Sequence, residues 1–291
     1  MEQERLTRTL KMNRKQSRRR TGVHPETFAE MEAVLIEREE RKKKSGRPAA
    51  LSLAEQLLMT LKFWREYRTF AHLGNDWGVH EATVHRTVER VEAALIASPQ
   101  VQMPKKRVFQ EAQIVYSIVA VGASEVPCER PKKVCRPDRL PFCTRQQRRW
   151  YSGKKKQHTL KFQLLICTVT QRILGTATSA GAVHELKLFR QSGVRFPHDT
   201  AVIGDAGYQG LWLRHRRAIT TQKATRASPL CTQQRQENRE LAYTRQGMEH
   251  VIRRMEVFRV LKGVYRHRRR RFALRVQLIA ALCNLTRACQ S

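Results

Sequence analysis

The feature that most constrains the fold of this chain is a change in its hydrophobic period near residue 114. Before that point, apolar residues recur at the three- and four-residue spacing of helices. After it, short apolar runs rich in β-branched residues begin with IVYSIVAV (114–121), the pattern of a buried strand. The sequence therefore predicts an all-α domain followed by an α/β domain.

Strand and helix patterns alternate through the second of these regions. We expect strands at 114–121, 158–170, 172–180, 200–210 and 217–224, and helices at 182–193, 233–262 and 270–289. This order predicts a mixed five-stranded sheet with flanking helices.

The first region, taken as a domain over residues 25–100, contains the pattern of a helix-turn-helix. Ser52 can cap a helix, a second short helix follows at about 68–77, and Gly78 gives the turn before a longer helix. An ordinary three-helix bundle is the alternative.

The long helix that follows the turn would carry the base contacts of a helix-turn-helix. Its apolar residues fall on one face, and His85 and Arg86 point the other way. We therefore expect His85 and Arg86 to contact DNA bases, as recognition helices do.

The chain is strongly basic, with 57 Lys and Arg against 25 Asp and Glu and a formal net charge of +32. Residues 101–160 hold 14 basic and 4 acidic side chains, and residues 251–291 hold 11 and 1, so each segment carries +10. The charge favours a nucleic-acid partner. No apolar run approaches the roughly 18–20 residues of a membrane span, so we expect no membrane segment. Residues 1–24 are expected to form a basic, flexible N-terminus.

Two carboxylates stand where a site is expected. Asp205 directly follows the apolar end of a strand, and Glu249 lies at the edge of the apolar stripe of a long helix. Oxygen ligands of this kind hold the metal ions of phosphoryl transfer. The alternatives are a turn cap for Asp205, and an ion pair with Arg245 or Arg253 for Glu249.

Several stretches resemble one family taken together. IGDAGYQG, RQGMEHVIRRMEVFR, ERPKK, YSGKKKQHTLK and AVHELKLFRQSG are similar to segments of bacterial insertion-sequence transposases of the DDE type, of the insertion sequence 5 and 4 groups. The resemblance covers about residues 25–288. It implies a helix-turn-helix domain and, over 110–289, a ribonuclease H-like DDE domain with an insertion near 134–144.

The resemblance also implies the chemistry and the partners. Two Mg²⁺ or Mn²⁺ ions would be held by Asp, Asp and Glu for DNA strand cleavage and strand transfer, with Asp205 as the second acid and Glu249 as the third. Arg245 would contact a DNA phosphate. The implied partner is double-stranded DNA, both terminal inverted repeats and target, bound by a homo-oligomer in the bacterial cytoplasm at the nucleoid.

The sequence departs from the family at the first acidic position. Gly122 stands there and offers no metal ligand, while the nearby Glu125 matches an acid that relatives also carry. Glu256 reverses a basic position, and Glu185 stands where relatives usually have Asp. We therefore predict a transposase by descent with impaired chemistry. A DNA-binding repressor of transposition and a metal-dependent nicking nuclease are the alternatives.

Basic side chains outside the acidic site are further candidates for DNA contact. Trp150 and Tyr151 precede three lysines, and this segment would either stack on unpaired bases or form a basic hairpin with two core aromatics. Residues 266–271 would bind phosphate or begin a solvated helix. The expected DNA contacts beyond the recognition helix are Lys154, Lys155, Lys156, Arg245, Arg253, Arg268, Arg269 and Arg270.

Overall fold

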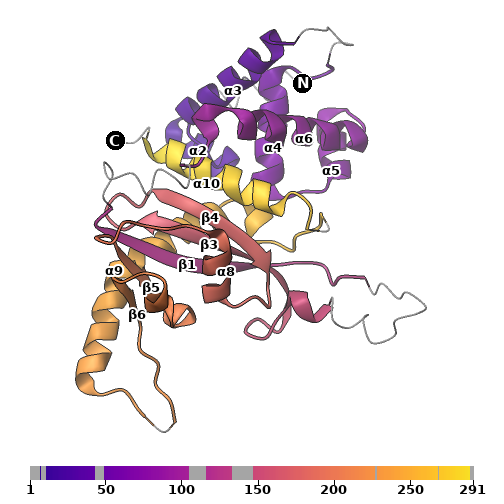
Figure 1. The fold of residues 1–291 in the computed structure, drawn as a ribbon. Coiled ribbons are helices and arrows are strands. Elements are labelled where there is room, and N and C mark those ends of the chain that lie inside the picture. Colours follow the sequence, from indigo (N-terminus) through magenta and orange to yellow (C-terminus); the bar gives the residue numbers. More distant parts are fainter. Residues whose placement is uncertain are drawn as a thin grey trace. The chain divides into compact units, whose positions relative to one another are not determined.

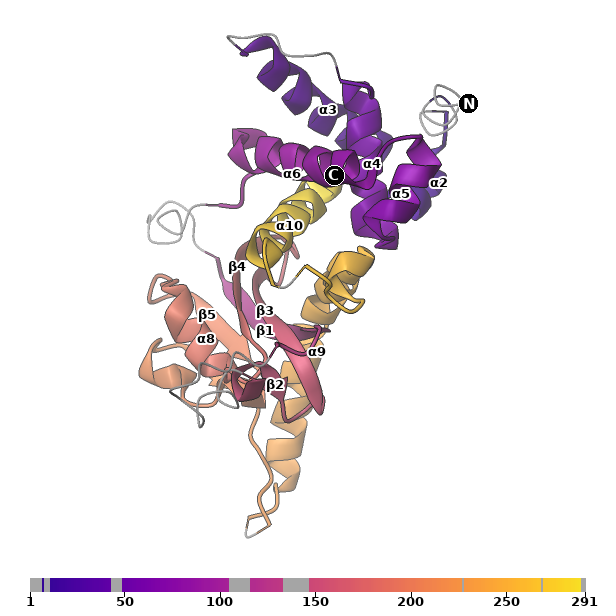
Figure 2. The ribbon, with the colours of Figure 1, turned by 90° about the vertical axis from the view of Figure 1, so that its right-hand side faces the viewer.

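The computed structural model describes residues 7, 11–42, 49–104, 116–132, 147–226, 228–267 and 269–288. The chain divides into two compact units (Figures 1 and 2). The helical unit comprises Met1–Gln102, Met255–Gly263 and Gln277–Ser291. The sheet unit comprises Met103–Arg254 and Val264–Val276. The expected insertion at 134–144 and Arg268 lie outside the described residues.

The two units differ from the expected domains 25–100 and 110–289, because two later segments belong to the helical unit. Phe258 packs so closely on Gly22 that a Cβ at Gly22 would lie 2.5 Å from its ring. The Arg65 guanidinium donates to the carbonyl of Val257 at 2.9 Å, and the Thr27 hydroxyl donates to Thr286 at 3.4 Å. These contacts bind both late segments to the early helices.

Residues 14–24 are ordered, which corrects the expectation that the whole of 1–24 is flexible. Helix α2 (Arg14–Thr21) begins at a capping box in which Asn13 and Gln16 exchange side-chain and backbone hydrogen bonds. It ends at Gly22, whose positive φ of 91° suits glycine. Thr21 and Val23 are fully buried, so the segment contributes to the core.

The remaining N-terminal helices of the helical unit follow the apolar pattern of the sequence. They are α3 (Pro25–Glu40), α4 (Leu53–Glu66), α5 (Phe70–Trp77) and α6 (Glu81–Ala97), followed by a 3₁₀ turn at Pro99–Val101. Ser52 and Glu55 form a capping box at the start of α4, as the sequence predicted for Ser52. Trp64 and Trp77 are fully buried and help to fill the core between these helices.

The sheet has one short strand more than the five expected. Its strands are β1 (Ile118–Pro127), β2 (Tyr151–Ser152), β3 (Gln157–Cys167), β4 (Ile173–Ala180), β5 (Ala201–Gly204) and β6 (Ala218–Thr220). The order is β2-β3-β1-β5-β6, with β4 also paired to β3. β3 is antiparallel to β1 and β4, whereas β1, β5 and β6 are parallel, so the sheet is mixed as predicted.

Helices cover both faces of this sheet. Helix α8 (Glu185–Ser192) packs on the face that carries Val119 and Val121. Helix α9 (Thr232–Glu256) packs on the other face, where its Met248 contacts Gly122. Figure 2 shows the strands between these two helices. Helix α10 (Phe272–Ala288) begins in the sheet unit and ends in the helical unit.

Candidate functional site

The register of the two central parallel strands brings Gly122 and Asp205 to one level of the sheet. Ala120 of β1 pairs with Ile203 of β5, and each chain reaches its site residue two positions later. β5 ends at Gly204, whereas β1 continues to Pro127 on the support of β3. Asp205 therefore emerges at the carboxyl end of β5, next to a position that has no side chain.

Asp205 has three polar neighbours. Its Oδ1 accepts a 3.0 Å hydrogen bond from the backbone N–H of Gly207 and so caps the turn that follows β5. Its Oδ2 lies 3.5 Å from a guanidinium nitrogen of Arg245 on α9. The Asp205 side chain is 39% exposed and that of Arg245 only 14%, so the carboxylate faces solvent while its cationic partner is largely covered.

The third neighbour of Asp205 is Glu185, at the first position of α8. Burial raises the pKa of the Glu185 carboxyl above its usual value, and the charge of Asp205 and a hydrogen bond to it add to the effect. A side chain at Gly207 would collide with Glu185, because a Cβ there would lie 2.0 Å from Oε2. The sequence showed Glu185 only as a departure from the family pattern, and gave no sign that it pairs with Asp205.

Glu125, the carboxylate nearest in sequence to Gly122, is held in a buried ion pair. Its carboxylate lies 3.4 Å from Nζ of Lys161 and accepts a 2.9 Å hydrogen bond from the Thr159 hydroxyl. The side chains of Glu125 and Lys161 are 8% and 7% exposed. Because a buried charge is stable only when it is paired, this carboxylate is held by its lysine.

The side chain of Met248 fills the space next to Gly122. A Cβ at Gly122 would lie 2.8 Å from Cγ and 3.1 Å from the sulfur of Met248. Met248 is fully buried and precedes Glu249 directly. An apolar thioether therefore occupies the space into which a side chain at residue 122 would project.

Glu249 lies on α9 one turn after Arg245 and is exposed. Within the described ranges, no three His, Cys, Asp or Glu side chains gather closely enough to hold a metal ion. Gly122 supplies no ligand, and Glu185 and Asp205 are engaged with each other. The described residues therefore do not fit a site held by three carboxylates.

Several of the expected DNA contacts of the sheet unit lie on exposed surface, whereas Arg245 is largely covered. Lys154, Lys155 and Lys156 form the exposed turn between β2 and β3, and Arg253 is exposed on α9. Tyr151 is 43% exposed and meets the His158 ring edge-on at 5.6 Å.

Trp150 is less available than Tyr151 for stacking on a base. The guanidinium of Arg269 lies over its ring, 4.5 Å from the centroid. This cation–π contact engages both residues with each other.

The helix-turn-helix is built around a close approach of backbone to backbone. A Cβ at Gly74 of α5 would lie 2.5 Å from the carbonyl oxygen of Val79. Gly78 ends α5 with a φ of 63°, and α6 begins three residues later at Glu81. His85 and Arg86 are both exposed on α6, where the His85 ring packs edge-on against Phe70 at 5.4 Å.

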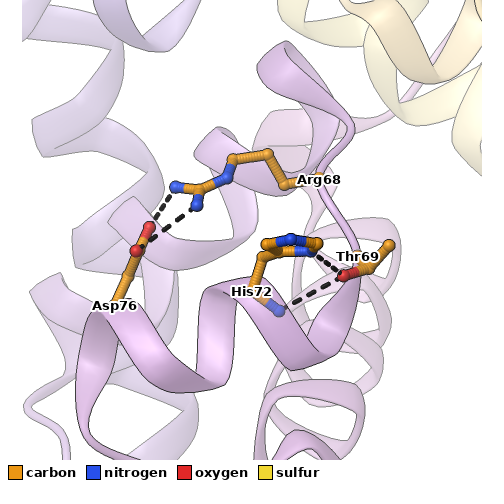
Figure 3. Close-up of polar contacts among 4 residues, drawn as sticks. All are labelled: Arg68, Thr69, His72 and Asp76. Carbon is orange, nitrogen blue, oxygen red and sulfur yellow. Dashed lines mark hydrogen bonds and ion pairs between the residues drawn. The ribbon is translucent and has the colours of Figure 1, made fainter.

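Polar contacts fix the start and the end of α5 (Figure 3). The Thr69 hydroxyl accepts from the backbone N–H of His72 at 3.2 Å and caps the helix. Arg68 forms an ion pair with Asp76 at the other end of α5, and a second guanidinium nitrogen lies 3.4 Å from the same carboxylate. The short helix is thereby held at both ends before the turn.

Comparisons with known proteins agree with this arrangement. The family described as DDE superfamily endonuclease matches residues 121–284, and the helix-turn-helix of DDE superfamily endonuclease matches residues 49–100. The chain is 37% identical over 279 residues to a probable transposase for insertion sequence element IS702 of Microchaete diplosiphon, covering 96% of this chain and 97% of that protein. The chain belongs to the DDE superfamily of endonucleases.

Two further comparisons of this DDE superfamily chain also gave transposases. A putative transposase for insertion sequence element IS112 of Streptomyces albus G is 22% identical over 83% of this chain and 84% of its own. The solved Mos1 transposase paired-end complex with left transposon end aligns over 68% of this chain and 66% of that one, at 10% identity and a TM-score of 0.18.

Two predictions are thereby confirmed: the insertion-sequence DDE family, and a helix-turn-helix domain before a mixed-sheet domain with flanking helices. Endonucleases of this superfamily use divalent metal ions. Among the described residues, no helix combines the length and apolar character that a membrane span requires.

Proposed function

We propose that this chain is the transposase of an insertion sequence, that it binds the ends of its element, and that its strand cleavage and strand transfer are impaired. The observation that carries the proposal is the placement of Gly122, with Met248 against it, at the level of Asp205. A carboxylate is missing at the point where the family's chemistry needs one.

The proposal assigns roles to the residues that remain. Asp205 and Glu249 are the metal ligands that this chain retains for Mg²⁺ or Mn²⁺, and Arg245 contacts a DNA phosphate. At present Arg245 lies 3.5 Å from Asp205, so its guanidinium neutralises a charge that a metal ion would otherwise balance.

The DNA partner is supported by exposed positive charge. The chain carries +32, and His85 and Arg86 are exposed on the second helix of the helix-turn-helix. We assign base contacts in the terminal inverted repeats to these two residues. The assigned phosphate contacts in the sheet unit are Lys154, Lys155, Lys156, Arg253, Arg269 and Arg270. We expect the protein to act on paired DNA ends as a homo-oligomer, at the nucleoid.

Met248 makes the loss at Gly122 harder to reverse than a missing ligand alone. An aspartate at residue 122 would bring Cβ within 2.8 Å of Met248 and would place its carboxylate against a buried thioether. Overpacking of this kind costs about 1–3 kcal/mol, and burying an unpaired carboxylate costs more. Restored activity therefore requires a smaller residue at 248 as well as an acid at 122.

The test compares the parent with Gly122→Asp, Met248→Ala and the double variant, on duplex DNA that carries the inverted repeats flanking the gene. With Mn²⁺ present, we expect cleaved and strand-transferred DNA from the double variant, little from Gly122→Asp alone, and none from the parent. Gel-shift binding to the same duplex should be alike in all four proteins.

The matched control is Gly122→Asn with Met248→Ala, which has nearly the same shape without the negative charge and should give no product. Strong Mn²⁺-dependent cleavage by the parent contradicts the proposal. A double variant that binds DNA and remains inactive would show that another residue causes the loss of activity, and Glu256 would be the first to test. Nicked DNA without strand-transfer product would indicate a nuclease.

The packing of Met248 also favours a second candidate function. A site filled by an apolar side chain is stable without metal, and the DNA-binding residues of α6 are unaffected by it. A catalytically inactive repressor that occupies the element's ends is consistent with both facts. It predicts that the parent protein inhibits transposition by an active relative in the same cell.

A further inference from the structure

A cavity of the sheet unit that is distinct from the acidic site lies at the amino ends of β5 and β6. It has a volume of about 690 Å³ and is formed by the end of α8 and by the segments 193–198 and 213–216. Volumes of this size hold small organic ligands. We call this cavity the arginine pocket.

Four arginines line the arginine pocket, and no acidic residue does: Arg190, Arg195, Arg214 and Arg216. All four are exposed. In the described parts of the chain, none of their guanidinium groups has an ion pair or a side-chain hydrogen bond. The pocket therefore offers four cations that are available to an anionic ligand.

The floor of the pocket is apolar. Phe189, Val194 and Phe196 line it and are 5%, 8% and 9% exposed. At the rim, Leu213 is 72% exposed, and the preceding Trp212 is 55% exposed. Large apolar side chains left in water next to arginines form a surface that suits a ligand with a flat apolar part and a negative part.

The pocket is separate from the acidic site. Glu185 begins α8, whereas Arg190 lies near its end, and a helix of eight residues is about 12 Å long. Asp205 follows the carboxyl end of β5, whereas the residues 193–198 precede its amino end. The two sites therefore lie at opposite ends of the parallel strands.

We propose that the arginine pocket binds one nucleotide of an unpaired DNA strand, with the base on the phenylalanine floor and the flanking phosphates on the arginines. Charge complementarity selects a polyanion, and phosphodiesters are matched by guanidinium groups. The concave apolar floor selects an unpaired base, because a paired base is held within its duplex and exposes only its edges. An acidic protein segment would use the charges but leaves the floor without a planar partner.

The proposal does not depend on the proposed catalytic function. It uses no residue of the acidic site, so the pocket would bind an unpaired strand even if Gly122 and Met248 proved irrelevant to cleavage. A pocket for an unpaired strand is useful to a protein that handles DNA ends, whether or not the protein cuts them.

The test uses Trp212 as a reporter in the full chain. Trp64 and Trp77 are fully buried, so Trp150→Phe leaves Trp212 as the exposed tryptophan. Titration with a thymidine oligonucleotide of about eight residues, within the range of single-strand site sizes, should quench Trp212 and reach saturation. The double variant Arg195→Gln, Arg214→Gln should weaken this binding at least tenfold.

Two controls separate this pocket from general attraction to a basic protein. Arg235→Gln with Arg239→Gln removes the same charge from exposed positions of α9 and should change the affinity less than twofold. An abasic oligonucleotide of equal length and charge should bind several-fold more weakly than the thymidine oligonucleotide.

Each contrary result overturns the proposal. If Trp212 gives no signal, or if the two double variants lose equal affinity, the binding would be non-specific attraction to a basic protein. Equal binding of the abasic strand or of a duplex would show that no base binds to the apolar floor of the pocket. Stronger quenching by a poly-glutamate peptide would reassign the pocket to an acidic protein segment.

Discussion

Two glycines stand at close approaches in the two units, and they differ in what they approach. A Cβ at Gly74 would meet the backbone carbonyl of Val79 at 2.5 Å, whereas a Cβ at Gly122 would meet the side chain of Met248 at 2.8 Å. A backbone atom held by two helices cannot withdraw, but a methionine can be exchanged or can change rotamer. A side chain at Gly74 therefore cannot be accommodated without moving the helix-turn-helix, whereas one at Gly122 can be accommodated when Met248 changes.

The largest effect on stability is expected from a substitution at Gly74, the first of these two glycines. Gly74→Ala should lower the free energy of unfolding by about 3 kcal/mol or more, because the clash is with backbone and forces α5 away from α6. Urea unfolding followed by circular dichroism measures it. Gly153→Ala is the control, since a Cβ there has no atom within 4 Å. A Gly74→Ala protein of unchanged stability would show that the turn adapts.

The second prediction concerns Gly122 and Met248 as a pair. Gly122→Ala should cost about 1–3 kcal/mol by overpacking, and Met248→Ala about 2–5 kcal/mol by opening a cavity. The double variant should cost less than the sum by about 1 kcal/mol, because the new methyl group occupies part of that cavity. Unfolding free energies of all four proteins complete the cycle. Strict additivity would mean that the two residues do not touch.

A smaller effect on stability is expected from the carboxylate pair formed by Glu185 and Asp205. The folded protein raises the pKa of Glu185, so it holds a proton at pH values where the unfolded chain has released it. The free energy of unfolding therefore falls as the pH rises from the ordinary carboxyl range to the raised value.

Glu185→Gln should remove this dependence and stabilise the protein at neutral pH, by less than about 1 kcal/mol because the group is partly exposed to solvent. Urea midpoints across the acid range measure it. Glu240→Gln, an exposed change on α9, should leave the profile unaltered. A profile that Glu185→Gln leaves unchanged would contradict a raised pKa of Glu185 in the folded protein.

The smallest effect is expected at the Arg68–Asp76 ion pair. Both side chains are about one-third exposed, and pairs of this kind contribute about 0.2–1 kcal/mol. A double-mutant cycle with Arg68→Gln and Asp76→Asn measures the coupling, which should shrink as salt is added. A coupling above this range would show that α5 depends on its ion pair as well as on Gly74.

Local signals in the sequence predicted most of the helical unit. The capping box at Ser52, the turn at Gly78 and the apolar face of α6 each act within a few residues, so their meaning can be read without the fold. α2 was missed because its charged sequence RKQSRRRT has no apolar face, and its stability comes from caps and from burial of Thr21.

The order of strands and helices in the sheet unit was predicted well, but the residues at which the strands begin and end were predicted less well. The run at 114–121 is continuously apolar and gives no register, and β1 in fact spans Ile118–Pro127 because β3 supports it past the end of β5. β2 is two residues long and carries no pattern of its own.

Contacts between distant segments could not be predicted at all. The packing of Met248 on Gly122 and the pairing of Glu185 with Asp205 join residues far apart in sequence, so they depend on the finished sheet. The arginine pocket is similar, since its four cations come from three separate segments. Gly122 was assigned to the first acidic position by resemblance alone, and the strand register places it at the level of Asp205.

The contact of Phe258 with Gly22 has a consequence for how the chain is made. Translation delivers residues 1–102 long before Phe258 and Thr286, yet the helical unit includes both late segments. A nascent chain that has released only its first hundred residues therefore exposes the apolar surface that Phe258 later covers. We expect a fragment ending at residue 102 to aggregate or bind chaperones, whereas co-expression of residues 255–291 as a separate peptide should reduce that aggregation.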